Sequence, residues 1–319
     1  MATTHADPAE AIRLLDGIQR LLRDSSFTTD YKLAVLHAIC DLAQELEPGA
    51  DELSLNGISE RVIELYWHQS PEFTTPGSST PLRLRHSSDA KDPIIVKHVQ
   101  ECSRTFHGHL RAARIAGQFP ELAAEVLDTL ERYPLELLQR EGGAILYQWP
   151  AAGDTLRLLP GVAAVLRRFY DLLIDMIQVR WTLFIERRTD GLEGNGRLRD
   201  HLFGTSREEL RCVVEPMLRL QDHRCFYLPT VTLTASSAVV DHFLPWSRTR
   251  DNSVGNLVLT TKPFNTKKSD DLRPEFRDRW DKRNLDSAEA LQKIARDNGL
   301  LWHPQALSNR ARSLFGQAG

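Results

Sequence analysis

Residues 240–271 read VDHFLPWSRTRDNSVGNLVLTTKPFNTKKSDD, and this stretch decides the fold of the C-terminal part of the chain. Just before and into it, SSAVVD at residues 236–241 has the composition of a short strand. NLVLTT at residues 256–261 predicts a second strand, which a polar connection separates from the first. A short helix is expected from about Pro263. The order is therefore strand, loop, strand, helix.

Such a unit is compact enough to bring Asp241, His242 and Asn265 together around one ion, with Asn256 bracing the loop between the strands. Asn256 follows His242 by fourteen positions, and Asn265 follows Asn256 by nine. An Asp-His pair or a single Asn carries no information alone, since Asn is most often a turn residue. The spacing of the whole set is what indicates a metal-dependent site.

These residues resemble the HNH endonucleases, a family whose active site is a ββα-metal finger. The resemblance is carried by VDHFLPWS, DNSVGNLVLTT and FNTKKSD, with Asn in the third position of the motif, as in the HNH domain of RNA-guided CRISPR effectors. More loosely, LRLQDHRCFYLP resembles the lead-in of bacterial HNH proteins, and YKLAVLHAICDLA with ELYWHQ resembles the helical N-terminal part of some of them. The resemblance implies a nuclease.

The chemistry of phosphodiester hydrolysis fits the residue types. Histidine can take a proton from water near neutral pH, so we assign His242 as the general base and Asn256 as the catalytic-site residue that holds it. Asp241 and Asn265 are the expected ligands of one divalent ion, and their oxygen atoms favour Mg²⁺ or Mn²⁺. The expected contacts to substrate phosphate are Lys268, with Lys267 and Arg248 as weaker candidates.

Paired cysteines that bind a structural zinc are common in the family, and this chain lacks them. Cys225 is followed by FYLP, and Phe264 precedes Asn265. The four cysteines are scattered without a C-x-x-C pair, so neither a zinc ribbon nor a disulfide framework is expected. Packing of apolar side chains against the helical part must then hold the finger together.

Composition agrees with a globular protein of one or two domains. The chain has 319 residues, of which 41% are hydrophobic and 26% charged. No apolar run is long enough to span a membrane, and MATTHADPAE lacks the features of a signal peptide, so we expect a cytoplasmic protein without a membrane partner. Residues 1–100 hold 9 Lys/Arg against 15 Asp/Glu, whereas residues 241–284 hold 10 against 7, which hints at an anionic partner for the C-terminal part.

The predicted fold class is mainly α with a C-terminal ββα-metal (HNH) finger, α+β overall. Residues 1–215 form a mainly helical region with a long loop at about 70–93 and a hairpin at about 144–158, and this region is a candidate recognition or partner-binding part. The nuclease domain is expected at residues 216–284, and a helical tail at 285–319.

Three functions remain open from the sequence. The first is a metal-dependent HNH endonuclease that cuts DNA, in bacterial restriction or anti-phage defence by analogy and with a defence-system partner protein. The second is an RNase of toxin type. The 2′-hydroxyl of RNA allows a metal-free route, so cleavage that survives EDTA would favour this function. The third is a nucleic-acid-binding or scaffold module with an inactive finger. Loss of cleavage in His242→Ala separates the first two from the third.

Overall fold

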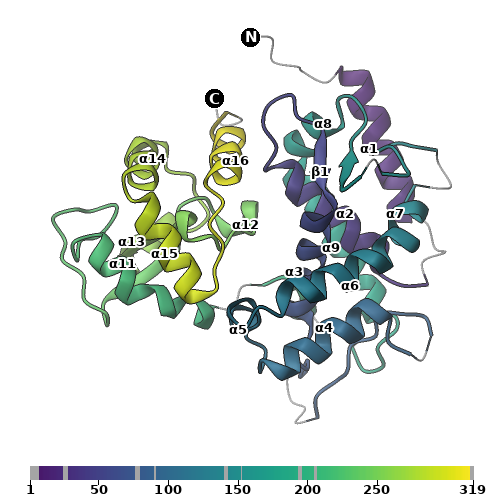
Figure 1. The fold of residues 1–319 in the computed structure, drawn as a ribbon, viewed down its shortest axis with the longest axis horizontal. Helices are drawn as coiled ribbons and strands as arrows, with labels where there is room; N and C mark the ends of the chain where they lie inside the picture. The colour runs from purple at the N-terminus through teal and green to yellow at the C-terminus, as the bar shows by residue number, and fades with distance from the viewer. Residues whose placement is uncertain are drawn as a thin grey trace. The chain divides into compact units, whose positions relative to one another are not determined.

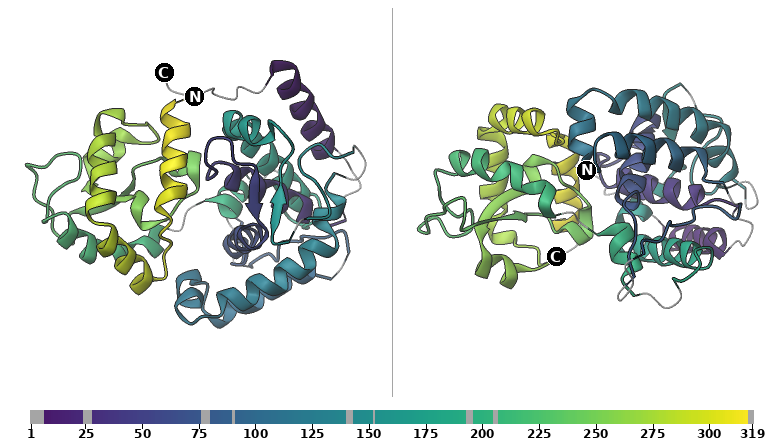
Figure 2. Two further views of the ribbon diagram at one scale, coloured as in Figure 1. Left: turned by 45° about the horizontal axis from the view of Figure 1, so that its top comes forward. Right: turned by 90° about the horizontal axis from the view of Figure 1, so that it is seen from below.

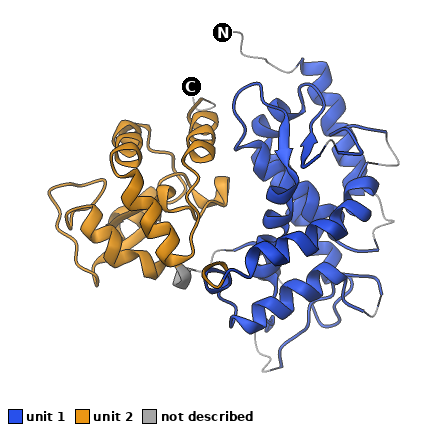
Figure 3. Ribbon diagram, in the orientation of Figure 1, with its two compact units in different colours: residues 1–113, 117–204 blue, residues 114–116, 205–319 orange. Residues whose placement is uncertain are grey.

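The chain folds into two compact units, each with its own hydrophobic core (Figure 3). The computed structural model describes residues 7–23, 28–75, 80–89, 91–139, 143–151, 153–192, 196–204 and 207–316. Unit 1 comprises residues 1–113 and 117–204, and unit 2 comprises residues 114–116 and 205–319. In the part of the chain that is described, no helix is long and apolar enough to cross a membrane.

Unit 1 is almost entirely helical, with two three-residue strands (Figure 1). Its elements are α1 (Pro8–Arg23), α2 (Tyr31–Ala43), β1 (Glu52–Ser54), α3 (Leu55–Gln69), α4 (Ile94–Thr105), α5 (Leu110–Ile115), α6 (Phe119–Arg132), α7 (Pro134–Leu137), β2 (Thr155–Arg157), α8 (Val162–Arg168), α9 (Tyr170–Glu186) and α10 (Leu198–Phe203).

Helix α2 is the centre of unit 1 because it is apolar nearly all round and is buried on nearly all of its surface. Asp30, just before α2, is also buried, and burial of a carboxylate requires partners. It accepts hydrogen bonds from the Tyr66 hydroxyl at 2.7 Å, from His86 Nδ1 at 2.7 Å and from Trp181 Nε1 at 2.6 Å. These bonds tie α2, α3 and α9 to the loop that carries His86.

Several features predicted for the N-terminal region take a different form in the structure. Apolar residues at helical spacing predict a single long helix from about Gly161 to Glu186, but the structure has two helices there, α8 and α9, separated at Phe169. In the expected hairpin, Tyr147 faces Leu158 in an isolated bridge, while residues 155–157 pair as β2 with β1 in an antiparallel register. Among the described residues between Gln69 and Ile94, where a long loop was predicted, no helix forms.

Unit 2 contains the predicted ββα arrangement, so the fold class is confirmed. Strands β3 (Ala238–His242) and β4 (Leu257–Thr261) are antiparallel, with Val240 opposite Leu259 and His242 opposite Leu257. The remaining elements are a 3-10 helix (Arg207–Val213), α11 (Val214–Leu220), α12 (Trp246–Thr249), a 3-10 helix (Val254–Asn256), α13 (Lys262–Lys268), a 3-10 helix (Pro274–Phe276), α14 (Arg277–Asp286), α15 (Ala288–Asn298) and α16 (Pro304–Gly316).

The C-terminal helices belong to the body of unit 2. Trp280 of α14 stacks on Phe243 with a ring-centroid distance of 4.7 Å. Leu291 of α15 and Leu307 and Ala311 of α16 are buried in the same cluster as the strand residues Leu257 and Leu259. Figures 1 and 2 show α15 and α16 in the same unit as α13. The described part of the predicted helical tail, residues 285–316, thus supplies part of the core around the strands.

Candidate active site

Asp241 and His242 are the last two residues of β3. Neighbouring side chains on a strand point to opposite faces, so the two side chains have different surroundings. Asp241 is buried toward α13, whereas His242 is partly exposed and contacts the loop between the strands. The strand end therefore presents a carboxylate and an imidazole side by side in sequence but with separate hydrogen-bond partners.

The Asp241 carboxylate has two partners inside unit 2. The Tyr227 hydroxyl donates a hydrogen bond of 2.6 Å to Oδ2, and Lys268 Nζ lies 3.3 Å from Oδ2 and 3.4 Å from Oδ1. Burial raises the pKa of Asp241 above its ordinary value, although Lys268 and the Tyr227 hydroxyl act in the opposite direction. Because burial also raises the pKa of Tyr227, its hydroxyl stays protonated and remains a donor.

Lys268 has a role other than the phosphate contact that we expected. The residue is 1% exposed, and Nζ donates a hydrogen bond of 2.8 Å to the main-chain carbonyl of His242. A lysine held in this way pairs with Asp241 and fixes the end of β3, so its ammonium group is not presented to a substrate. This placement argues against the predicted phosphate contact and makes Lys268 a structural counter-ion.

The two other predicted phosphate contacts lie nearer the surface. Lys267 is exposed on α13, one position before the buried Lys268. Arg248 is half-buried on α12, in the connection between the strands. Lys267 is therefore the better placed of the three basic residues for contact with a phosphate.

The imidazole of His242 is oriented by Asn252. His242 Nε2 lies 2.8 Å from Asn252 Oδ1, and an amide oxygen can only accept a hydrogen bond. Nε2 therefore carries the proton, which leaves Nδ1 as the nitrogen that accepts one. Burial lowers the pKa of His242 below its ordinary value, and the hydrogen bond to Asn252 offsets part of that change. The neutral ring is thus the dominant form at neutral pH, as a general base requires.

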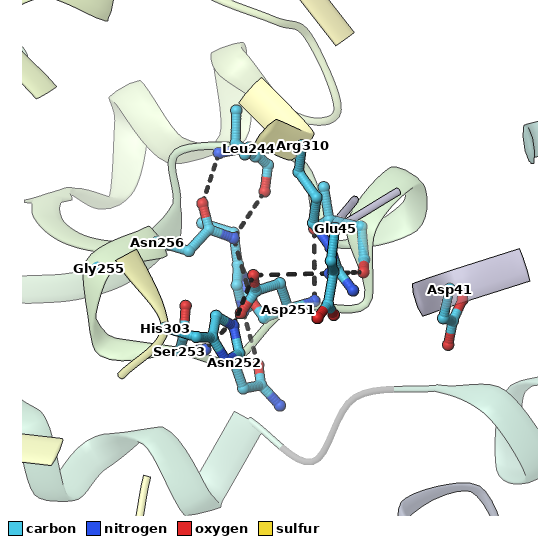
Figure 4. Close-up of polar contacts among 12 residues, drawn as sticks. Asp41, Glu45, Leu244, Asp251, Asn252, Ser253, Gly255, Asn256, His303 and Arg310 are labelled. Carbon is cyan, nitrogen blue, oxygen red and sulfur yellow. Dashed lines mark hydrogen bonds and ion pairs between the residues drawn. The ribbon is translucent and has the colours of Figure 1, made fainter. Parts of the chain in front are cut away.

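Asn256 is fully buried and braces the connection between the strands (Figure 4). Its Oδ1 accepts a hydrogen bond of 2.8 Å from Leu244 N, while Nδ2 donates to the carbonyl of Leu244 at 3.1 Å and to that of Asp251 at 3.0 Å. All three partners are main-chain groups. Asn256 therefore holds the loop that surrounds His242. None of these three hydrogen bonds involves the imidazole itself.

Asp251 lies beside Asn252 and is also buried, and Figure 4 shows it between His303 and Arg310. Its Oδ1 accepts a hydrogen bond of 2.7 Å from Ser253 N, and its Oδ2 lies 3.3 Å from His303 Nε2 and 3.5 Å from Arg310 Nη1. Burial acts to raise the pKa of Asp251, but His303, Arg310 and Ser253 N together hold it well below its ordinary value. The carboxylate stays ionised inside unit 2.

The residues present fit one oxygen-seeking divalent ion. Among the described residues, Asp241 Oδ1 has only the long contact to Lys268, so it keeps the capacity to accept a further partner. Asn265 is half-buried on α13, three positions before Lys268, and residues three apart share a helix face. Lys268 reaches Asp241 from this face of α13, so the same face carries Asn265, whose amide oxygen is the second oxygen ligand that we expect. Within the described ranges, no group of three or more His, Cys, Asp or Glu side chains offers an alternative metal site.

Five residues of this site were missed from the sequence: Tyr227, Asp251, Asn252, His303 and Arg310. Asn252 lies within the DNS segment of the motif, so its closeness to His242 could have been suspected from the expected loop. Tyr227 follows the cysteine in the lead-in segment. His303 and Arg310 lie some fifty positions or more beyond Asp251, and no local pattern in the sequence marks them.

Residues 230–273 match a family model described as HNH endonuclease. The matched segment contains β3, the connecting loop, β4 and α13, and it ends before α14. No curated protein and no solved structure match the chain.

Proposed function

Because residues 230–273 make this chain a member of the HNH endonuclease family, we propose that it hydrolyses DNA phosphodiester bonds with the help of one divalent ion, Mg²⁺ or Mn²⁺. The observation that carries the proposal is the Asn252–His242 hydrogen bond beside Asp241, because it leaves Nδ1 of a neutral imidazole as the proton acceptor next to a carboxylate.

His242 has the role of general base. Nδ1 takes a proton from the attacking water, and Asn252 Oδ1 continues to accept the hydrogen bond from Nε2–H, so it stabilises the imidazolium that forms. A general base of this kind contributes about 10²- to 10⁴-fold to the rate. Asn256 keeps the surrounding loop in place through its three main-chain hydrogen bonds.

Asp241 and Asn265 are the residues that would hold the metal ion. When bound there, the ion supplies positive charge that stabilises the developing negative charge on the phosphate and on the leaving 3′-oxygen. Lys268 and the Tyr227 hydroxyl hold the Asp241 carboxylate in place. The exposed Lys267 is the residue that we expect to contact the phosphate backbone, a contact that positions the substrate without reading its sequence.

The proposal is tested by incubating the purified protein with plasmid and single-stranded DNA in the presence of Mg²⁺ or Mn²⁺, beside His242→Ala and an EDTA control. We expect the wild type to cut DNA and both controls to lose cleavage, with a fall of about 10² or more for His242→Ala. RNA is included as a second substrate. Cleavage of RNA alone that survives EDTA would contradict the proposal.

We place the activity in bacterial restriction or anti-phage defence on the resemblance of the motif alone. Expression of the wild type and of His242→Ala in a bacterial host, followed by phage plating, tests this setting. Protection by the wild type and not by the variant is the expected result, and equal plating on both strains would contradict it.

A further inference from the structure

We propose that Asp251, His303 and Arg310 form a positioning network through which helix α16 sets the orientation of the His242 imidazole. The inference rests on the proposed function, since it treats His242 as the general base. It adds residues outside the segment that matches the family, because His303 and Arg310 lie beyond residue 273.

Asp251 depends on partners from a distant part of the chain. Its carboxylate is buried and ionised, and a buried charge is tolerated only with close partners. Two of the groups that face it come from the C-terminal end of the chain. His303, directly before α16, lies 3.3 Å away, and Arg310, within α16, lies 3.5 Å away. The side chain of Arg310 is itself buried. The ion pair between Asp251 and Arg310 therefore forms only when α16 is packed in its place in unit 2.

Hydrogen bonds anchor the main chain on both sides of Asn252. Ser253 N is fixed by Asp251 Oδ1 at 2.7 Å, and the Asp251 carbonyl is fixed by Asn256 Nδ2 at 3.0 Å. Arg310 Nη1 also donates a hydrogen bond of 2.5 Å to the Thr249 carbonyl, and Val254 N donates one of 3.0 Å to the Leu301 carbonyl. Asn252 is thus held between anchored neighbours, and several of the anchors come from residues 301–310.

The consequence concerns the tautomer of His242. The bond from Nε2–H to Asn252 Oδ1 decides which ring nitrogen accepts a proton, and it exists only while the loop keeps Asn252 at 2.8 Å. Small displacements of a catalytic group are costly, because a misplacement of about 1 Å lowers the rate about 10²-fold. Arg310 and His303 thereby act on the reaction without touching the reacting atoms. They are positioning residues.

The experiment compares Arg310→Met with Arg312→Met, a matched control on the exposed side of the same helix. Asn252→Ala removes the direct hydrogen-bond partner of His242, so it shows the tautomer and the rate that result when this bond is lost completely. The first readout is the ¹⁵N chemical shift of the two ring nitrogens of His242, which reports the tautomer without any need for activity. The second is kcat and KM for DNA cleavage.

We expect the wild type and Arg312→Met to show a protonated Nε2 and an unprotonated Nδ1. Arg310→Met and Asn252→Ala should show a mixture of tautomers and a fall in kcat of about 10²-fold with KM unchanged. A folded Arg310→Met with the wild-type tautomer and kcat would overturn the network.

Arg310 is buried, so its variant could fail to fold, and His303 provides a second test because its side chain is 24% exposed. His303→Gln keeps a donor near the position of Nε2, whereas His303→Leu removes it. We expect His303→Leu to shift the His242 tautomer and His303→Gln to restore it; identical wild-type spectra for both would also overturn the network. If the wild type cuts no nucleic acid but the tautomer shifts as expected, the network stands and the proposed function fails.

Discussion

Lys268 shows how far the surroundings of one residue change what its type suggests. In the sequence it is one of two adjacent lysines beside a metal-site motif, which indicates a phosphate contact. In the fold it is buried, and its ammonium group lies between the Asp241 carboxylate and the His242 carbonyl. Lys267, its neighbour, is exposed because successive helical residues point in different directions. The two lysines therefore have separate roles.

We predict that Lys268→Met destabilises unit 2 by about 3 kcal/mol, because it leaves the buried Asp241 carboxylate without its cation. Lys267→Met should change stability by less than about 0.5 kcal/mol, as is usual for surface substitutions, and should weaken DNA binding instead. Hydrogen exchange of the β3 and β4 amides reports unit 2 alone and measures the first effect. Equal exchange rates in the two variants would speak against the assignment.

Asp251 makes the stability of unit 2 depend on pH. Its folded-state pKa lies well below the value of about 3.9 for an unfolded chain, so the stabilisation is complete above that value. It is lost as the pH falls from about 4 toward the folded-state pKa, because the carboxylate must then be protonated. At neutral pH, Asp251→Asn removes the buried charge that pairs with His303 and Arg310 and should cost about 3 kcal/mol.

The corresponding measurement follows the same β3 and β4 amides in wild type and Asp251→Asn from pH 7 down to pH 3. We expect the difference in protection to be largest at neutral pH and to shrink below about pH 4. A difference that stays constant over the whole range would show that the charge of Asp251 does not stabilise unit 2.

The connection between β3 and β4 is the element that positions Asn252 and His242. Side chains of the C-terminal helices donate hydrogen bonds to its main chain. The Gly255 carbonyl accepts hydrogen bonds of 2.9 Å from Trp280 Nε1 and from Arg283 Nη2, and Arg283 Nη2 also reaches the Leu257 carbonyl at 3.2 Å. These two donors come from α14, in a segment whose basic residues alternate with acids in the sequence. Arg283 thus serves the fold of the loop rather than a nucleic-acid groove.

Gly255 allows this close approach. A Cβ atom there would lie 2.7 Å from Leu307 Cδ2 and 3.0 Å from Trp302 Cζ3, so these two side chains would have to shift to accept it. We predict that Gly255→Ala destabilises unit 2 by about 1–3 kcal/mol through overpacking. Gly316→Ala, at a position with open space around it, is the matched control and should have little effect. Chemical denaturation of both variants checks the difference, and a neutral Gly255→Ala would mean that α16 is loosely packed.

At the scale of the whole molecule, the two units have separate cores with no buried residue in common. Trp181 is buried in the first, where it donates to Asp30, and Trp280 is buried in the second, where it donates to Gly255. Each tryptophan combines a large apolar surface with one hydrogen bond, so the two positions are a matched pair.

We predict that calorimetry of the full chain shows two transitions, because two separate cores unfold as separate cooperative units. Trp280→Phe should lower one midpoint by several degrees and Trp181→Phe the other. If either substitution shifted both transitions by the same amount, the two units would have to unfold together.

The local part of the site was predictable because the residues concerned are close in sequence. The strand, loop, strand, helix order follows from β-branched runs and turn residues between 236 and 268, and it is confirmed in β3, β4 and α13. The assignment of His242 as base and of Asp241 and Asn265 as metal ligands stays a prediction that the geometry supports. The break of the long helix at Phe169 was not predictable, because apolar spacing continues across it.

The sequence by itself determined that this chain is mainly helical with an HNH finger near its C-terminus, since periodicity and motif spacing are local properties of the chain. Only the tertiary structure decided that Lys268 is a buried counter-ion, that Asn252 orients His242, and that His303 and Arg310 reach back to Asp251. The physical reason is that burial and pairing of a charge depend on which distant segments fold against it. Residue type and local spacing do not indicate which distant segments will pack against a given charge.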